Sequence, residues 1–81
     1  MAKTHELKTW IEHFEDVWNG VKTFELRKDD RGFQVGDELC LKEFNPETQK
    51  YTGSVQHKTV THILKGGQLG LKKGYVIMSL E

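Results

Sequence analysis

The sequence predicts a mainly β protein with some α structure: a small barrel or curled sheet of about five strands, plugged by one helix near the N-terminus. Three observations support this class. Apolar residues recur at the helical period only before Gly20, the later segments alternate between apolar and polar side chains, and turn-forming residues separate those segments. An open sheet in a chain of 81 residues has edges that are hard to cover, whereas closing the sheet removes them.

One helix is expected directly before Gly20. Thr9 followed by Glu12 fits a capping box, in which a hydroxyl and a carboxylate bind free amides of the first turn. Gly20 favours the left-handed conformation that ends many helices. We expect the whole apolar stripe, both tryptophans included, to pack into the core: Leu7, Trp10, Ile11, Phe14, Val17 and Trp18.

Residues 21–28 alternate as a strand does, because successive strand side chains point to opposite faces. One face holds Phe24 and Leu26, which we expect to be buried. The other face holds polar residues, which we expect to line a cleft: Thr23, Glu25 and Arg27.

Three more strands are expected at 38–44, 51–64 and 75–80, mostly in antiparallel pairs. The long middle stretch contains Gly53, which we expect to bend or bulge it. Turn signals separate the strands at 29–32, 45–48 and 65–70.

Composition narrows the function classes. Lysine plus arginine and aspartate plus glutamate both number 12, and a net charge of zero argues against a protein that grips phosphates over its whole surface. Locally the charge is less even, because residues 48–80 hold five lysines and no acid. We expect one cytoplasmic domain over residues 1–81, without signal peptide, membrane span or internal disulfide. The four histidines and Cys40 lack zinc-ligand spacing, so neither metal nor cofactor is expected.

The junction between the helix and the next strand concentrates polar side chains. Lys22 lies where the chain leaves the helix, and Glu25 and Arg27 share a strand face with Thr23. Arg27 offers a planar fork for a phosphate or base edge, and Glu25 can accept from an amino group. Such a cluster is typical of a seat for a nucleotide or small molecule. The alternative is a solvated strand face with a Glu25–Arg27 ion pair, which the spacing by itself favours.

The same segment matches the GxKxxExR signature of the ASCH superfamily through Gly20, Lys22, Glu25 and Arg27. The chain resembles a short bacterial and phage branch of that group over nearly its whole length, at 5–8, 33–37, 63–67 and 74–78. The resemblance implies a PUA-like β-pseudobarrel with helices across its opening, and an association with RNA. Some members hydrolyse modified nucleosides such as N4-acetylcytidine, and some are reported as ribonucleases. The implied site is the cleft between helix and barrel, lined by Lys22, Glu25 and Arg27.

The chain departs from the amidohydrolases of that group, whose arrangement resembles a lysine base, a threonine nucleophile and a late assisting glutamate. Their threonine lies two residues before the motif arginine, where this chain has Glu25, and Thr23 is out of register by two. No acid lies between Glu47 and Glu81 to assist. A lysine base also needs a lowered pKa, whereas a neighbouring carboxylate favours the ammonium. We therefore expect Lys22 to bind a phosphate or carbonyl, while a hydrolase would use Lys22, Thr23 and Glu25.

Further binding residues are expected near this cleft. His5 and Lys8 precede the helix. Lys65 begins the glycine-rich loop, whose free amides can cup a phosphate, although a flexible turn is the simpler interpretation. Tyr75 begins the last strand and can stack on a base if exposed. The sequence thus predicts a module that binds RNA, a nucleotide or a nucleoside; the alternatives are a hydrolase or ribonuclease and a protein-interaction module.

Overall fold

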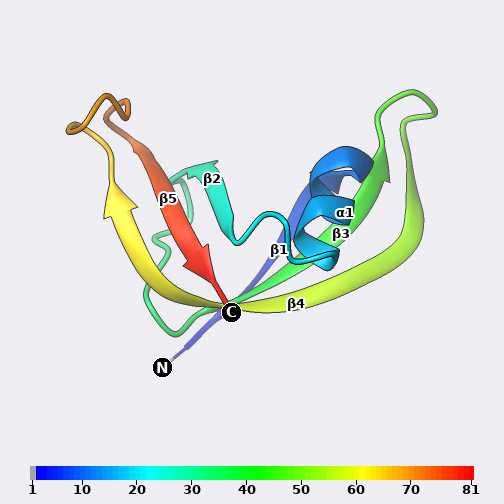
Figure 1. Cartoon of the computed structure of the whole chain (residues 1–81), viewed down its shortest axis with the longest axis horizontal. Helices are drawn as coiled ribbons and strands as arrows, with labels where there is room; N and C mark the ends of the chain where they lie inside the picture. The colour runs from blue at the N-terminus through cyan, green and yellow to red at the C-terminus, as the bar shows by residue number, and fades with distance from the viewer. Residues whose placement is uncertain (1) are drawn as a thin grey trace.

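Five strands and one helix form the described part of the chain, residues 2–81 of a computed structural model (Figure 1). In chain order they are β1 (Thr4–Trp10), α1 (Ile11–Trp18), β2 (Phe24–Lys28), β3 (Glu38–Asn45), β4 (Lys50–Lys65) and β5 (Tyr75–Leu80). Strand residues far outnumber helix residues, so the prediction of a mainly β fold with one N-terminal helix is confirmed. Within residues 2–81, no helix has the length and apolar character that crossing a membrane requires.

The strands form one mixed sheet in the order β1-β3-β4-β5-β2. β1 runs parallel to β3, and the other pairs are antiparallel. β4 spans 16 residues because its first half pairs with β3 and its second half with β5. Gly53, with a φ of 97°, lies where the β3–β4 register shifts, so the predicted bulge is confirmed.

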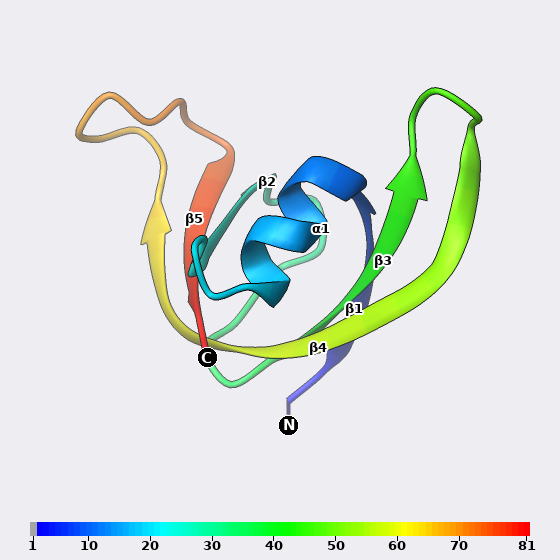
Figure 2. The same ribbon diagram turned by 45° about the vertical axis from the view of Figure 1, so that its right-hand side comes forward.

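The sheet curls around α1, which lies on its concave side (Figure 2). Phe14 and Val17 of α1 point into the core. Gln56 of β4 fixes the helix to the sheet, because its Nε2 donates a hydrogen bond to the Phe14 carbonyl oxygen at 2.9 Å. The rest of the core comes from the strands and one loop: Leu7, Phe33, Leu39, Leu41, Val60, Val76 and Met78.

β1 differs from the sequence prediction, in which Leu7 belongs to the helical stripe. His5, Leu7 and Thr9 are buried while the residues between them are exposed, and this period of two is that of a strand. Pairing with β3 along the whole strand holds it extended, a long-range effect that local spacing does not reveal. The helix begins at Ile11. The expected capping box is wrong, because the N-cap residue is Trp10, which makes no side-chain capping bond.

Two expectations about burial are also wrong. Trp10 and Trp18 are 54% and 66% exposed instead of lying in the core. On β2, Phe24 and Leu26 are 46% and 49% exposed, whereas Glu25 is 3% exposed. The predicted alternation holds, but the inner face is the polar one, because Glu25 has an arginine partner that compensates its buried charge.

Gly66 lies where the loop after β4 folds back on itself. A Cβ on this residue would stand 1.9 Å from the Lys72 carbonyl oxygen and 2.8 Å from that of Tyr75. Gly66→Ala should therefore lower the free energy of unfolding by about 1–3 kcal/mol, because backbone atoms must move to make room. Urea denaturation measures the loss, with the exposed Lys73→Ala in the same loop as control. An unchanged midpoint would show that the loop relaxes without energetic penalty.

Candidate functional site

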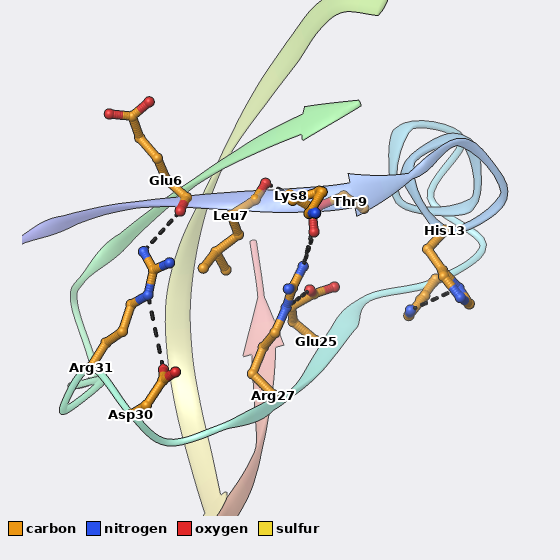
Figure 3. Close-up of polar contacts among 10 residues, drawn as sticks. Glu6, Leu7, Lys8, Thr9, His13, Glu25, Arg27, Asp30 and Arg31 are labelled. Atoms are coloured by element: carbon orange, nitrogen blue, oxygen red, sulfur yellow. Dashed lines mark hydrogen bonds and ion pairs between the residues drawn. The ribbon is translucent and has the colours of Figure 1, made fainter. Parts of the chain in front are cut away.

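The two ends of the sheet, β1 and β2, are joined through side chains, and we call this boundary the seam. Arg27 of β2 donates from Nε to Glu25 Oε2 at 2.5 Å. Its Nη2 donates to the Lys8 carbonyl oxygen at 2.9 Å and to Thr9 Oγ1 at 3.3 Å (Figure 3). Because β1 is an edge strand of the described sheet, that carbonyl has no strand beside it. Arg27 therefore supplies a hydrogen bond that a closing strand would otherwise give.

A second arginine bridges the same seam. Arg31, in the loop after β2, donates from Nη1 to the Glu6 carbonyl oxygen at 2.8 Å (Figure 3). Its Nε lies 3.9 Å from Asp30 Oδ1. Glu6 and Lys8 are two residues apart on β1, so their carbonyl oxygens point to the same side of the strand. Two arginine side chains thus hold the curled sheet together where its backbone ladder ends.

A cavity of about 310 Å³ opens at the seam. Nε and Nη2 of Arg27 are occupied, but Nη1 has no acceptor within residues 2–81 and keeps two N–H donors for a ligand. Arg27 is thus fixed by the fold and still has donors to offer. The residues that line the cavity come from β1, α1 and β2: Lys8, Thr9, Trp10, His13 and Arg27.

Lys22 adds positive charge beside this cavity. Its Nζ lies 3.4 Å from Nδ1 of His13, a lining residue, and 5.4 Å from the centroid of the Phe24 ring. A lysine ammonium can only donate, so in this contact His13 accepts on Nδ1 and carries its proton on Nε2. Three cationic residues, Lys8, Lys22 and Arg27, therefore lie at or next to one small space, and phosphate oxygens suit such a group.

Among the signature residues, Arg27 lines the cavity and Lys22 lies beside it, whereas Gly20 and Glu25, as well as Thr23 between them, do not line it. Glu25 is buried, and its carboxylate positions the Arg27 guanidinium. Gly20 has a φ of 75° and ends α1; its amide donates to the Val17 carbonyl oxygen at 3.1 Å and is not available to a ligand. Thr23 is exposed in the loop before β2.

His5 lies inside the sheet rather than at the cavity. Its Nε2 donates to Asp37 Oδ2 at 2.8 Å, and its ring packs edge-on against Phe33 at 4.7 Å between centroids. The backbone amides of Lys3 and Gln34 also donate to Asp37, each at 3.0 Å. Burial raises the pKa of this carboxyl, but the hydrogen bonds from His5 and the two amides outweigh it, so the pKa of Asp37 lies below 3.8. The pair ties β1 to the start of β3.

Neither Lys65, the last residue of β4, nor Tyr75, the first residue of β5, lines the cavity; the glycine-rich loop joins these two strands (Figure 1). Tyr75 pairs with Lys28 on the outer face, whereas Arg27 and its partner Val76 face inward. Lys65 pairs with Val76 from the other side. Lys65 therefore lies on the same face of the sheet as Arg27. The two residues are two strand spacings apart, a distance of about 10 Å.

The cavity includes three residues that the sequence did not mark as binding residues: Thr9, Trp10 and His13. The alternation over residues 4–10 is a signal that places Lys8 and Trp10 together on an exposed strand face. His13 has no comparable signal, because its position depends on how α1 returns toward β2.

A family model matches residues 4–80. The chain belongs to the DUF3850 family, a domain of unknown function. This DUF3850 chain is also 46% identical over 44 residues to an uncharacterized 12.9 kDa protein in the GpA 3′ region of Escherichia phage P2. The match covers 54% of this chain and 40% of the phage protein, so the matched segment is less than half of that relative. A phage protein is thus among the relatives of this chain.

Proposed function

We propose that this DUF3850 domain binds RNA or a nucleotide at the seam cavity. The proposal is carried by the convergence of Lys8, Lys22 and Arg27 on a cavity beside the exposed indole of Trp10. Guanidinium and ammonium groups match phosphate oxygens, and an indole offers a base a stacking surface. The neutral net charge of the chain fits a local contact of this kind rather than a broad phosphate-binding surface.

The GxKxxExR signature supports the same site, since it contains Lys22, Arg27 and the glutamate that positions that arginine. We therefore also propose a relation to the ASCH superfamily and its PUA-like pseudobarrel. A curled sheet that stays open at the seam and holds α1 on its concave side supports this relation (Figure 2). The expected cytoplasmic location fits an RNA partner.

The contacts favour binding over hydrolysis. A hydrolase of the expected type would need Lys22 or Glu25 to reach the hydroxyl of Thr23. Instead, Lys22 contacts His13, and Glu25 is engaged with Arg27. We therefore propose no hydrolytic step.

Lys22→Ala should weaken the binding of uridine 5′-monophosphate about tenfold, the loss of one contact to a charged group. The domain should stay folded, because Lys22 contacts only an exposed histidine and one aromatic ring. An NMR amide-shift titration of the labelled protein measures the affinity. The matched control is Lys73→Ala, which removes an exposed lysine on the loop before β5.

The titration also separates the alternatives. Uridine, which lacks the phosphate, should bind more weakly than its monophosphate if the cations make the main contacts. Shifts should cluster at residues 8–13 and 22–27. No shift with millimolar nucleotide and none with a short RNA would overturn the proposal and would favour a protein partner.

A further inference from the structure

An aromatic row crosses the outer face of β1, β3 and β4. Trp10 pairs with Phe44, and Phe44 pairs with Tyr51, so the three residues lie side by side on neighbouring strands. Trp10 and Tyr51 are each 54% exposed, while Phe44 is buried between its neighbours. The rings of Phe44 and Tyr51 meet edge to face, 5.1 Å between centroids. Two exposed aromatic side chains thus stand about 10 Å apart, two strand spacings, on a shared aromatic base.

A pair of lysines occupies the next row of the same face. Lys8 pairs with Lys42, and no acid belongs to this row or to the aromatic one. Lys8 Nζ lies 4.6 Å from the centroid of Phe44, and Lys42 Nζ lies 5.5 Å from that of Tyr51. Lys42 also contacts Glu6 Oε1 at 3.1 Å, and this hydrogen bond raises the pKa of the ammonium. The rings therefore stand beside fixed positive charges.

We propose that this face binds single-stranded RNA, with bases stacked on Trp10 and Tyr51 and phosphates at Lys8 and Lys42. The inference rests on the proposed function and extends it, because Lys8 and Trp10 also line the seam cavity. A single-stranded RNA whose phosphate binds Arg27 at the seam cavity would pass over Trp10 and reach the aromatic row. Any base can stack on an aromatic ring. We therefore expect this face to prefer single strands over duplexes without preferring a particular sequence.

The chemistry of the face argues for RNA over a protein partner. Lysine is depleted in protein–protein interfaces, whereas exposed aromatic rings interleaved with lysines are the usual surface for unpaired bases. A duplex presents its bases edge-on within grooves, so it cannot stack on separate rings. Lys42 would have to leave Glu6 to contact a phosphate of the RNA backbone, and each such phosphate contact makes the affinity depend on salt.

Fluorescence anisotropy with a labelled oligouridylate of about eight nucleotides tests the proposal. Tyr51→Ala should weaken the oligonucleotide about tenfold and leave uridine 5′-monophosphate unchanged, since Tyr51 is not a lining residue of the cavity. Tyr51→Phe keeps the ring and should bind like the wild type. Lys42→Ala should lower the slope of log affinity against log salt by about one. Trp18→Ala removes an exposed ring outside the row and is the matched control.

The outcomes keep the two proposals apart. If Lys22→Ala weakens the oligonucleotide while Tyr51→Ala does not, the aromatic row is refuted and the seam cavity stands. If Tyr51→Ala weakens it while Lys22→Ala has no effect on either probe, the cavity is refuted and the row stands. Tighter binding of the oligodeoxyuridylate of the same length would overturn RNA as the occupant. Binding of neither probe overturns both proposals.

Discussion

Arg27→Ala should lower the free energy of unfolding by up to about 3–5 kcal/mol, because it removes the half-buried partner of a buried carboxylate. Glu25 is buried, so this substitution leaves its carboxylate in the interior without a counter-charge. The Lys8 carbonyl oxygen and the Thr9 hydroxyl also lose their donor at the seam. Small domains are stable by only ~5–15 kcal/mol, so a loss of this size brings the variant close to unfolding at room temperature.

Urea denaturation measures this loss. The double variant Glu25→Leu/Arg27→Leu removes both charges and should recover part of the stability. Equal stability of Arg27→Ala and wild type would mean that water replaces the guanidinium at the seam.

The same reasoning decides which variants can test function. A loss of binding in Arg27→Ala or Glu25→Ala has two explanations, because both residues hold the seam as well as the cavity. Lys22 and Tyr51 are better probes, since neither side chain bridges the two ends of the sheet: Lys22 contacts the exposed His13, and Tyr51 packs on Phe44 of the neighbouring strand.

The strands that pair with a sequence neighbour were predictable. β3, β4 and β5 follow the alternation and turn residues within one residue of the expected bounds, because local spacing and local pairing agree. β1 was not predictable in this way. Its partner in the parallel pairing begins 34 residues later, at Glu38 opposite Thr4, and its apolar residues also fit a helical stripe.

The candidate site was only partly foreseeable from the sequence. Of the residues predicted to bind, Lys8 and Arg27 line the seam cavity, Lys22 lies beside it, and Glu25 pairs with Arg27. The inward face of β2 was not predictable. Glu25 can be buried because Arg27 pairs with it and is itself held by β1. The β1 acceptors of Arg27, the Lys8 carbonyl oxygen and the Thr9 hydroxyl, lie 19 and 18 residues earlier in the chain. Periodicity identifies two faces of a strand, but only the tertiary partners decide which of them can be buried.

Asp37→Ala should lower the free energy of unfolding by about 3 kcal/mol, because a buried acceptor of three hydrogen bonds is removed. The His5 ring is affected most, because it is buried and its Nε2 loses the carboxylate that accepts its hydrogen bond. Asp37→Asn keeps one side-chain oxygen and should lose less. His5→Ala is the matched partner variant: combined with Asp37→Ala, the two losses should sum to more than the loss of the double variant.

Acid should remove the contribution of Asp37 specifically. The pKa of its carboxyl is below 3.8 in the folded protein, so the unfolded chain takes up the proton first as the pH falls. The stabilisation is therefore complete above about pH 4 and is lost as the pH falls through the lowered folded pKa. Urea denaturation from about pH 5 to about pH 2 should show wild type losing more stability than Asp37→Asn, which cannot titrate at this position. Other carboxylates titrate in both proteins, so their effects cancel in the difference between the two curves. Parallel pH profiles would mean that Asp37 gains no stabilisation from its charge, and that the buried pair with His5 holds β1 to the sheet by shape and neutral hydrogen bonds only.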